Sequence, residues 1–298
     1  MTDNLRGILA ILASATAFVV NDTLVKLATE HLPTGEIIVV RGVMATLILA
    51  VAATIAGAWC SPAVFLKPAM LVRLVASAFA TLFIVMALRY LPLATTSAIL
   101  QVTPLAVTAG AALVYGERVG PSRWAAALTG FLGVLLIVKP GSSVFGAAAF
   151  TVLIALIFTT TRDLTTRGLA RDIPSMFVGA ASAASISLAG LLVAPFDEPW
   201  LSPTWSDWKL MFVSAVLLFF GNTLLIIALR TGEIGVVAPF RYTPVPLSLG
   251  LGYAWWGHVP DAIAIVGIVM VLSAGLFVLF SERLRLVAQA KPREVDGK

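Results

Sequence analysis

The stretch VVAPFRYTPVPLSLGLG, residues 236–252, decides how this chain is organised. It is apolar enough to lie in a membrane, yet it contains one arginine and three prolines: Arg241, Pro239, Pro244 and Pro246. An arginine at the middle of a span costs at least about 2.5–3.5 kcal/mol, and a proline removes a backbone donor and clashes with the preceding turn. A span with both features is therefore expected to face a cavity or other protein groups instead of lipid.

The composition of the whole chain is that of a membrane protein. Of its 298 residues, 59% are hydrophobic and only 12% are charged, and the mean hydropathy is +0.99. Soluble domains carry about 25% charged residues. Apolar segments of about 20 residues, enough to cross the hydrocarbon core as helices, follow one another almost without pause. We therefore expect an all-α polytopic membrane protein. Its net charge of +5 says little about nucleic acid, which is not an expected partner.

Ten transmembrane helices are predicted. They cover residues 5–29, 35–57, 70–90, 93–115, 121–138, 144–162, 172–194, 208–230, 234–256 and 260–281. The first could instead be a cleaved signal peptide, with Ala15 and Ala17 framing the cleavage site. The internal repeat described below favours a retained span, because this segment has a counterpart later in the chain.

Lysine and arginine set the expected orientation. If the N-terminus is cytoplasmic, most of the 20 basic residues fall on the cytoplasmic side. Cytoplasmic loops carry the excess of Lys and Arg in membrane proteins. Both termini are therefore predicted to lie in the cytoplasm.

The two halves of the chain are related by an internal repeat. Three residues of the first half recur 141 positions later: Asp22, Lys26 and Pro33 match Asp163, Arg167 and Pro174. The tripeptide ALR at 87–89 recurs at 228–230 with the same offset, and TP at 103–104 recurs at 243–244. Each half holds five spans, an odd number, so the second half enters the membrane from the other side. That is the inverted repeat of secondary transporters.

The repeat divides the chain into three predicted parts. Residues 1–141 form the first five-helix repeat, residues 142–283 form the second, inverted one, and residues 284–298 form a polar cytoplasmic tail. The single cysteine, Cys60, excludes an intramolecular disulfide between the parts.

These features resemble a known family. The ten spans, the inverted repeat, the mid-span TP and the segment YGERVGPSRWAAALTGFLGVLLIV at 115–138 are similar to the drug/metabolite transporter superfamily, of the EamA type. The second half departs from the pattern, since WWGHVPDA at 255–262 has no counterpart of Glu117. The resemblance implies export of amino acids or similar small metabolites across a bacterial inner membrane by alternating access. It is most like the exporters of aromatic and other neutral amino acids.

Two alternatives within the superfamily stay open: a lipid flippase, and an antiporter of nucleotide sugars or phosphometabolites. More basic residues deep in the spans would favour phosphorylated substrates. Only Arg241 lies deep, with Arg41 nearer a span end, so a small zwitterion is preferred.

An enzyme is not expected. His31 and His258 lie in predicted loops, and the sequence shows no paired intramembrane carboxylates, metal-ligand cluster or phosphate loop. No cofactor or metal is expected. Membrane lipids and a small-molecule substrate are the expected partners. The sequence leaves the oligomeric state open, and a monomer is compatible with it.

The substrate site is predicted at the middle of the membrane, between the repeats. Pro104 and Pro244 break the fourth and ninth spans there and are predicted hinges. Gln101 and Arg241 come three residues before these prolines, as repeat equivalents expected on either side of the midplane. Arg241 has two interpretations: its guanidinium binds a substrate carboxylate, or it satisfies carbonyls freed by Pro244 and Pro246.

Other candidates for the substrate site are polar or aromatic residues of the same bundle. They are Thr81 and its repeat equivalent Asn222, Thr103, and the aromatic residues Phe79, Phe83, Phe158 and Tyr242. The alternative interpretation of the polar residues is helix packing or a bond to their own helix. The alternative for the aromatic residues is packing or contact with lipid.

Two charged pairs are candidate gates at opposite membrane surfaces. They are Asp22 with Lys26 and Asp163 with Arg167, each spaced i, i+4. The alternative is a local ion pair along each helix. The acids in or beside the spans lie near span ends: Asp22, Glu36, Glu117 and Glu233. A proton relay usually places acids within spans, so this pattern favours facilitated export over proton coupling.

Overall fold

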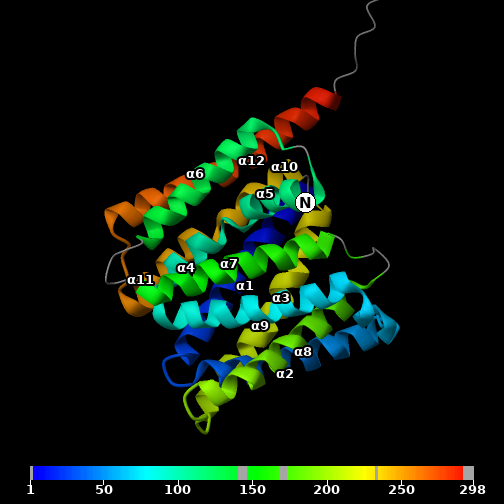
Figure 1. Ribbon diagram of the computed structural model, residues 1–298, viewed down its shortest axis with the longest axis vertical. Helices are drawn as coiled ribbons and strands as arrows, with labels where there is room; N and C mark the ends of the chain where they lie inside the picture. The colour runs from blue at the N-terminus through cyan, green and yellow to red at the C-terminus, as the bar shows by residue number, and fades with distance from the viewer. Residues whose placement is uncertain are drawn as a thin grey trace, which may run out of the picture.

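The computed structural model describes residues 3–117, 119–139, 146–167, 169, 173–231 and 234–290, and every regular element in these ranges is helical. The first half holds α1 (Asp3–Ala28), α2 (Thr34–Ile55), the 3-10 helix η1 (Pro62–Leu66), α3 (Pro68–Tyr90), α4 (Leu93–Leu100), α5 (Thr103–Tyr115) and α6 (Pro121–Val138). The second half holds α7 (Gly146–Arg167), α8 (Ser175–Val193), η2 (Ala194–Phe196), α9 (Trp205–Thr231), α10 (Ile234–Val237), η3 (Ala238–Tyr242), α11 (Pro244–Trp256) and α12 (Ala262–Ala290) (Figure 1).

The predicted all-α membrane fold is confirmed. Within the described ranges, nine helical segments are long and apolar enough to cross a membrane, with α4 and α5 together forming one of them. The remaining crossing, the ninth in chain order, consists of α10, η3 and α11, which together cover 234–256. Two helices are longer than predicted: α7 continues to Arg167 and α12 continues to Ala290. Their extensions are polar, so an apolar span of about 20 residues does not mark them.

Helices of the two halves interleave instead of forming separate bodies. The first helix of each half packs on the third of the other, α1 on α9 and α7 on α3. Equivalent helices also pair with each other: α2 with α8, and α6 with α12 (Figure 1). This pairing is symmetric under exchange of the halves, as an inverted repeat requires.

Glycine permits the closest of these crossings. A Cβ atom built on Gly133 of α6 would lie 2.7 Å from the carbonyl oxygen of Gly267 in α12, and one on Gly267 would lie 2.5 Å from that of Gly133. Small residues let two backbones approach in a membrane, where association depends on packing.

Two clusters of buried apolar side chains hold the bundle together. One joins α4, α6, α11 and α12 and includes Ile99, Ile137 and Val271. The other joins α1, α2, α3 and α9 and includes Val25, Ile37 and Met211.

The bundle has two ends, which we name by the helices that finish there. The terminal face is where α1 begins and α12 ends, and in Figure 1 the N-terminus and the red end of α12 lie toward the upper right. The opposite face is where α1, α3 and α11 end. The assignment of the terminal face to the cytoplasm stays a prediction.

Candidate substrate site and gates

Two broken helices meet inside the bundle. Helix α4 ends at Leu100, and α5 begins at Thr103 with Pro104 in its first turn. In the second half, η3 leads into α11, which begins at Pro244. Proline is tolerated in the first turn of a helix because no donor is needed there. The breaks therefore fall at the two predicted hinge prolines.

The predicted equivalents Gln101 and Arg241 are in direct contact. The Nε2 atom of Gln101 donates to the backbone oxygen of Arg241 at 2.7 Å. In a 3-10 helix, that oxygen would accept from the residue three positions later. That residue is Pro244, which has no N–H, so Gln101 supplies the missing donor. The placement of the two residues on either side of the midplane stays a prediction, and their direct contact at the break was not predicted.

The side chain of Arg241 is exposed, although it lies within a membrane crossing. Among the described residues, its guanidinium has no hydrogen bond or ion pair, and the carbonyl at the break is taken by Gln101. The structural interpretation, the alternative to substrate binding, was that the Arg241 side chain donates to backbone carbonyls freed by Pro244 and Pro246. The five N–H donors of the guanidinium are thus available to water or to a ligand.

Three phenylalanine rings stack near the middle of α3 and α7. Phe158 of α7 lies 5.1 Å from Phe79 and 6.1 Å from Phe83, both of α3, measured between ring centroids. The corresponding interplanar angles are 22° and 5°. Phe79 is 41% exposed, and the other two rings are partly exposed. We call these three residues the phenylalanine platform. Its rings offer a flat apolar surface for offset stacking.

Other predicted site residues are engaged elsewhere. Tyr242 is buried, and its hydroxyl lies so close to Gly275 of α12 that a Cβ there would be 1.8 Å away. Thr103 donates to the carbonyl of Leu100 at 2.6 Å. Asn222 is exposed, and its amide donates to its own helix, to Leu218 at 2.8 Å. Thr81 is half-buried in α3.

Lys26 binds helix ends across the bundle. Its Nζ atom donates to the carbonyl oxygens of Leu88 at 2.6 Å and Leu91 at 2.8 Å, where α3 ends. It also lies 5.4 Å from the ring centroid of Trp256, at the end of α11. The last carbonyls of a helix have no hydrogen-bond donor within that helix. A cation there donates to these oxygens and also interacts favourably with the negative end of the helix dipole. One buried ammonium group therefore ties α1, α3 and α11 together at the opposite face.

Asp22 belongs to a different network from the predicted pair with Lys26. Its Oδ1 accepts from the Nδ2 of Asn21 at 2.8 Å, and Asn21 in turn accepts from Ser214 of α9 at 2.7 Å. The charge that acts on Asp22 is that of Arg41, roughly two turns into α2. Sequence reasoning noted Arg41 inside a span but did not connect it with Asp22.

The end of α11 and the loop that follows it contact the segment after α1. Trp256 donates its indole N–H to the Glu30 carboxylate at 2.5 Å and stacks on His258 at 6.4 Å between centroids. Partial burial, and then the charge of Lys26, lower the pKa of His258 from its ordinary value. The imidazole therefore favours its neutral form in this position.

The terminal face is held by contacts of α7. Asp163 pairs with Arg162 of its own helix, with Nε and Oδ1 2.9 Å apart. Arg73 of α3 donates to Thr166 and, at 3.4 Å, to the carbonyl of Arg162. The Tyr115 hydroxyl, at the end of α5, donates to the carbonyl of Leu164 at 3.0 Å. The predicted gate residue Arg167 has its side chain outside the described part of the chain.

A sequence model of the EamA-like transporter family matches the chain twice, over residues 5–139 and 146–280. The chain belongs to the EamA-like transporter family. This EamA-type protein is accordingly a member of the drug/metabolite transporter superfamily, and the resemblance found in the sequence is confirmed.

Named relatives are transporters of small metabolites. The pseudopaline exporter CntI of Pseudomonas aeruginosa strain UCBPP-PA14 is 31% identical over 273 residues, which cover 90% of this chain and 93% of the exporter. A riboflavin transporter of Rhizobium johnstonii is 28% identical, covering 72% of this chain and 71% of the relative. An S-adenosylmethionine uptake transporter of Rickettsia prowazekii is 24% identical, covering 64% and 65%. The EamA-type chain is therefore a multi-pass membrane transporter of small metabolites.

A solved crystal structure supports the fold. It aligns with a TM-score of 0.64 over 95% of this chain and 98% of the other, at 20% identity. The ten-helix arrangement is thus shared with a protein of very different sequence.

Proposed function

We propose that this protein exports amino acids, or small metabolites with a carboxylate and a planar ring, across a bacterial inner membrane with both termini in the cytoplasm. The observation that carries the proposal is the exposed Arg241 guanidinium, without a described partner, beside the break in the ninth crossing. A guanidinium forms two parallel hydrogen bonds with a carboxylate. Backbone carbonyls near the two breaks accept from the ammonium group of the same substrate.

The phenylalanine platform supports a substrate with a flat apolar part. Its three rings are partly exposed and nearly parallel, so a fourth ring can extend the stack. Two relatives are named for riboflavin and S-adenosylmethionine, and both compounds contain planar heteroaromatic rings. Aromatic amino acids meet the same two requirements, a carboxylate and a ring.

In the proposed alternating-access cycle, contacts at the two faces of the bundle close the substrate site in turn. Lys26 closes the opposite face by binding the end of α3, and its release would open the site to that side. Residues near Asp163 close the terminal face in the alternate state. A phosphorylated substrate is less well supported, because the charge of the second arginine within a span, Arg41, is partly offset by that of Asp22.

Transport by the purified protein in liposomes tests the proposal. The panel contains labelled phenylalanine, leucine, riboflavin, S-adenosylmethionine and a nucleotide sugar, each with and without a pH gradient. We expect counterflow of phenylalanine, competed by other aromatic amino acids and independent of the pH gradient. Counterflow of the nucleotide sugar alone, or of no amino acid, would overturn the proposed substrate class.

A further inference from the structure

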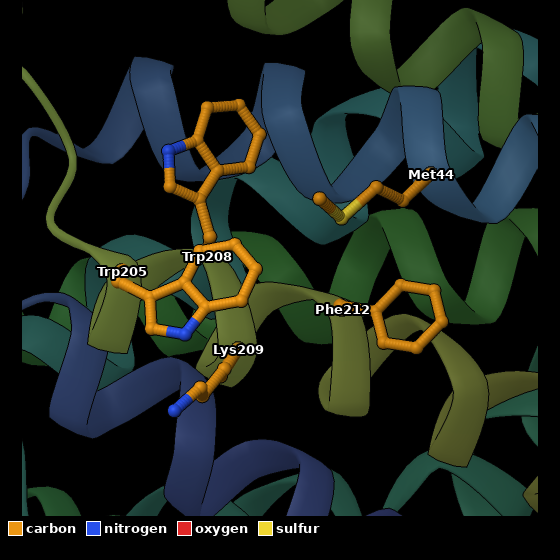
Figure 2. A pocket seen from close by; sticks show the side chains of 5 residues that line it. All are labelled: Met44, Trp205, Trp208, Lys209 and Phe212. Atoms are coloured by element: carbon orange, nitrogen blue, oxygen red, sulfur yellow. The ribbon is translucent and has the colours of Figure 1, made fainter.

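A pocket lies away from the broken helices, on the surface between α2 and α9. Its volume is about 360 Å³, and it is lined by Met44 of α2 and by Trp205, Trp208, Lys209 and Phe212 of α9 (Figure 2). The residues of the candidate substrate site, Gln101 and Arg241, lie on other helices. The proposed transport cycle makes no use of this pocket.

The surface that lines the pocket is apolar, and the one cation among its residues, Lys209, extends its amine away from Met44 and Phe212 (Figure 2). The Nζ atom of Lys209 lies 5.5 Å from the ring centroid of Trp205, and none of the described carboxylates forms an ion pair with it. Two carboxylates of this end are engaged with backbone groups. Asp207 caps its own helix by accepting from Thr204 at 2.8 Å, and Glu36 accepts from the Leu201 N–H at 3.0 Å.

The pocket runs from the membrane surface toward the hydrocarbon. Trp205 is the first residue of α9, so the two tryptophans and Lys209 lie where a span enters the membrane. Tryptophan is typical of the interface, and lysine extends its amine toward the headgroups. Phe212 lies seven residues after Trp205 in the same helix, which places it about 10 Å deeper in the membrane at the rise of an α-helix. In Figure 2 the tryptophans and Lys209 occupy one side, and Met44 and Phe212 the other.

We propose that this pocket binds an anionic phospholipid. The phosphate pairs with the Lys209 ammonium group, the indole rings of Trp205 and Trp208 contact the glycerol region, and one acyl chain lies between Met44 and Phe212. The charge selects for an anionic headgroup, because the cation has no described acidic partner. The apolar end selects for a chain, because its lining offers no hydrogen-bonding group. A bound lipid would bridge α2 and α9, the helix that also packs on α1.

Fluorescence quenching by brominated lipids tests this proposal directly. The full chain is placed in phosphatidylcholine vesicles with rising fractions of dibrominated phosphatidylglycerol or, separately, dibrominated phosphatidylcholine. The chain has seven tryptophans, so the Trp205→Phe, Trp208→Phe double variant identifies the signal from the pocket. We expect the pocket component to be quenched at a several-fold lower fraction of phosphatidylglycerol than of phosphatidylcholine.

Two variants and a matched control make the result specific. Lys209→Gln should remove the preference for phosphatidylglycerol, whereas Lys139→Gln should keep it, since Lys139 pairs with Asp261 at the same face. Met44→Phe should fill part of the pocket without adding a fluorophore and weaken quenching by both lipids, which separates occupancy from charge. Equal quenching by the two lipids in the parent protein, or an unchanged preference in a folded Lys209→Gln protein, would overturn the proposal. A cross-linked dimer through Phe212 would assign the pocket to a second copy and overturn it as well.

Discussion

The two faces of the bundle are held by different kinds of contact. At the opposite face, Lys26 of α1 reaches across to the last carbonyls of α3, so one side chain joins the α1–α9 pair to the α3–α7 pair. At the terminal face, Tyr115 and Arg73 bind α7 to its own neighbours, α5 and α3. No comparable contact joins α7 to α9 within the described residues. The repeat thus supplies equivalent helices to both faces. Among the described residues, a side-chain bridge between the two pairs is seen at the opposite face, and the side chain of Arg167, the equivalent of Lys26, lies outside that part of the chain.

In the proposed cycle, a symmetric architecture holds one face closed at a time, so the contacts at the two faces differ. In that cycle, the closing contact is the Lys26 ammonium group on helix-end carbonyls, which water can replace when the helices separate. Such carbonyls exist at the end of every helix, so closure needs no acidic partner for Lys26.

The largest expected effect concerns the site between the two faces. Arg241→Ala should abolish transport, and Arg241→Lys should reduce it at least tenfold, because the ammonium group lacks the planar fork. Neither should lower the melting temperature in detergent by more than a few degrees, since Gln101, not the guanidinium, satisfies the carbonyl at the break. Transport and thermal unfolding are measured on the same preparations. An Arg241→Ala protein that transports normally, or that fails only because it unfolds, would restore the structural interpretation.

The second largest effect is expected from Lys26→Met, which should open the opposite face. Lys26→Met leaves the oxygens of Leu88 and Leu91 without this donor, at about 1–3 kcal/mol for each unsatisfied group. That cost weakens the closed state by roughly tenfold or more. A reporter cysteine at Thr95 of α4, in a Cys60→Ala background, should then react about tenfold faster with an impermeant maleimide. Lys139→Met, at the same face, is the control and should leave the rate unchanged. Equal labelling in all three proteins would show that Lys26 does not close this face.

A smaller effect is expected from the other face. Tyr115→Phe removes one neutral hydrogen bond, worth about 0.5–1.5 kcal/mol, between helices that stay packed by other contacts. Transport should fall no more than about threefold, and labelling at Thr95 should not change. A Tyr115→Phe protein as defective as Lys26→Met would mean that both faces are closed in the same way.

The smallest effect is a dependence of closure on pH. Partial burial and the charge of Lys26 lower the pKa of His258, so the closed state favours the neutral ring beside Trp256. As the pH falls below the ordinary value of 6.5, the open state binds the proton better, and closure weakens. Labelling at Thr95 should rise modestly between pH 7.5 and 5.5 and stay flat in His258→Gln. Glu30, which accepts from Trp256, is the other charge of this cluster, and Glu30→Gln tests its share.

Much of the fold could be predicted from the sequence because its signals are local. Apolar runs of about 20 residues set the spans, and Pro104 and Pro244 set the two breaks. The contact between Gln101 and Arg241 could not be predicted, although both were chosen as candidates. Their repeat relation gives equivalent positions but no distance, and the distance depends on how α4 and η3 cross.

The gates were harder to predict for a physical reason. Lys26 was identified, but its partners are backbone oxygens, which carry no residue signature. The pairing expected with Asp22 followed from helical spacing alone. Asp22 instead responds to Arg41, whose position beside α1 depends on how α2 folds back.

Double electron–electron resonance between spin labels tests the central claim, that the two faces close alternately. One pair, at His31 and Tyr90, reports the ends of α1 and α3 at the opposite face, and a second, at Thr165 and Ile226, reports α7 and α9 at the terminal face. During turnover with the substrate identified in liposomes, we predict that the first distance increases while the second decreases. If both distances change in the same sense, or neither changes during active transport, the two faces do not alternate and the account is wrong.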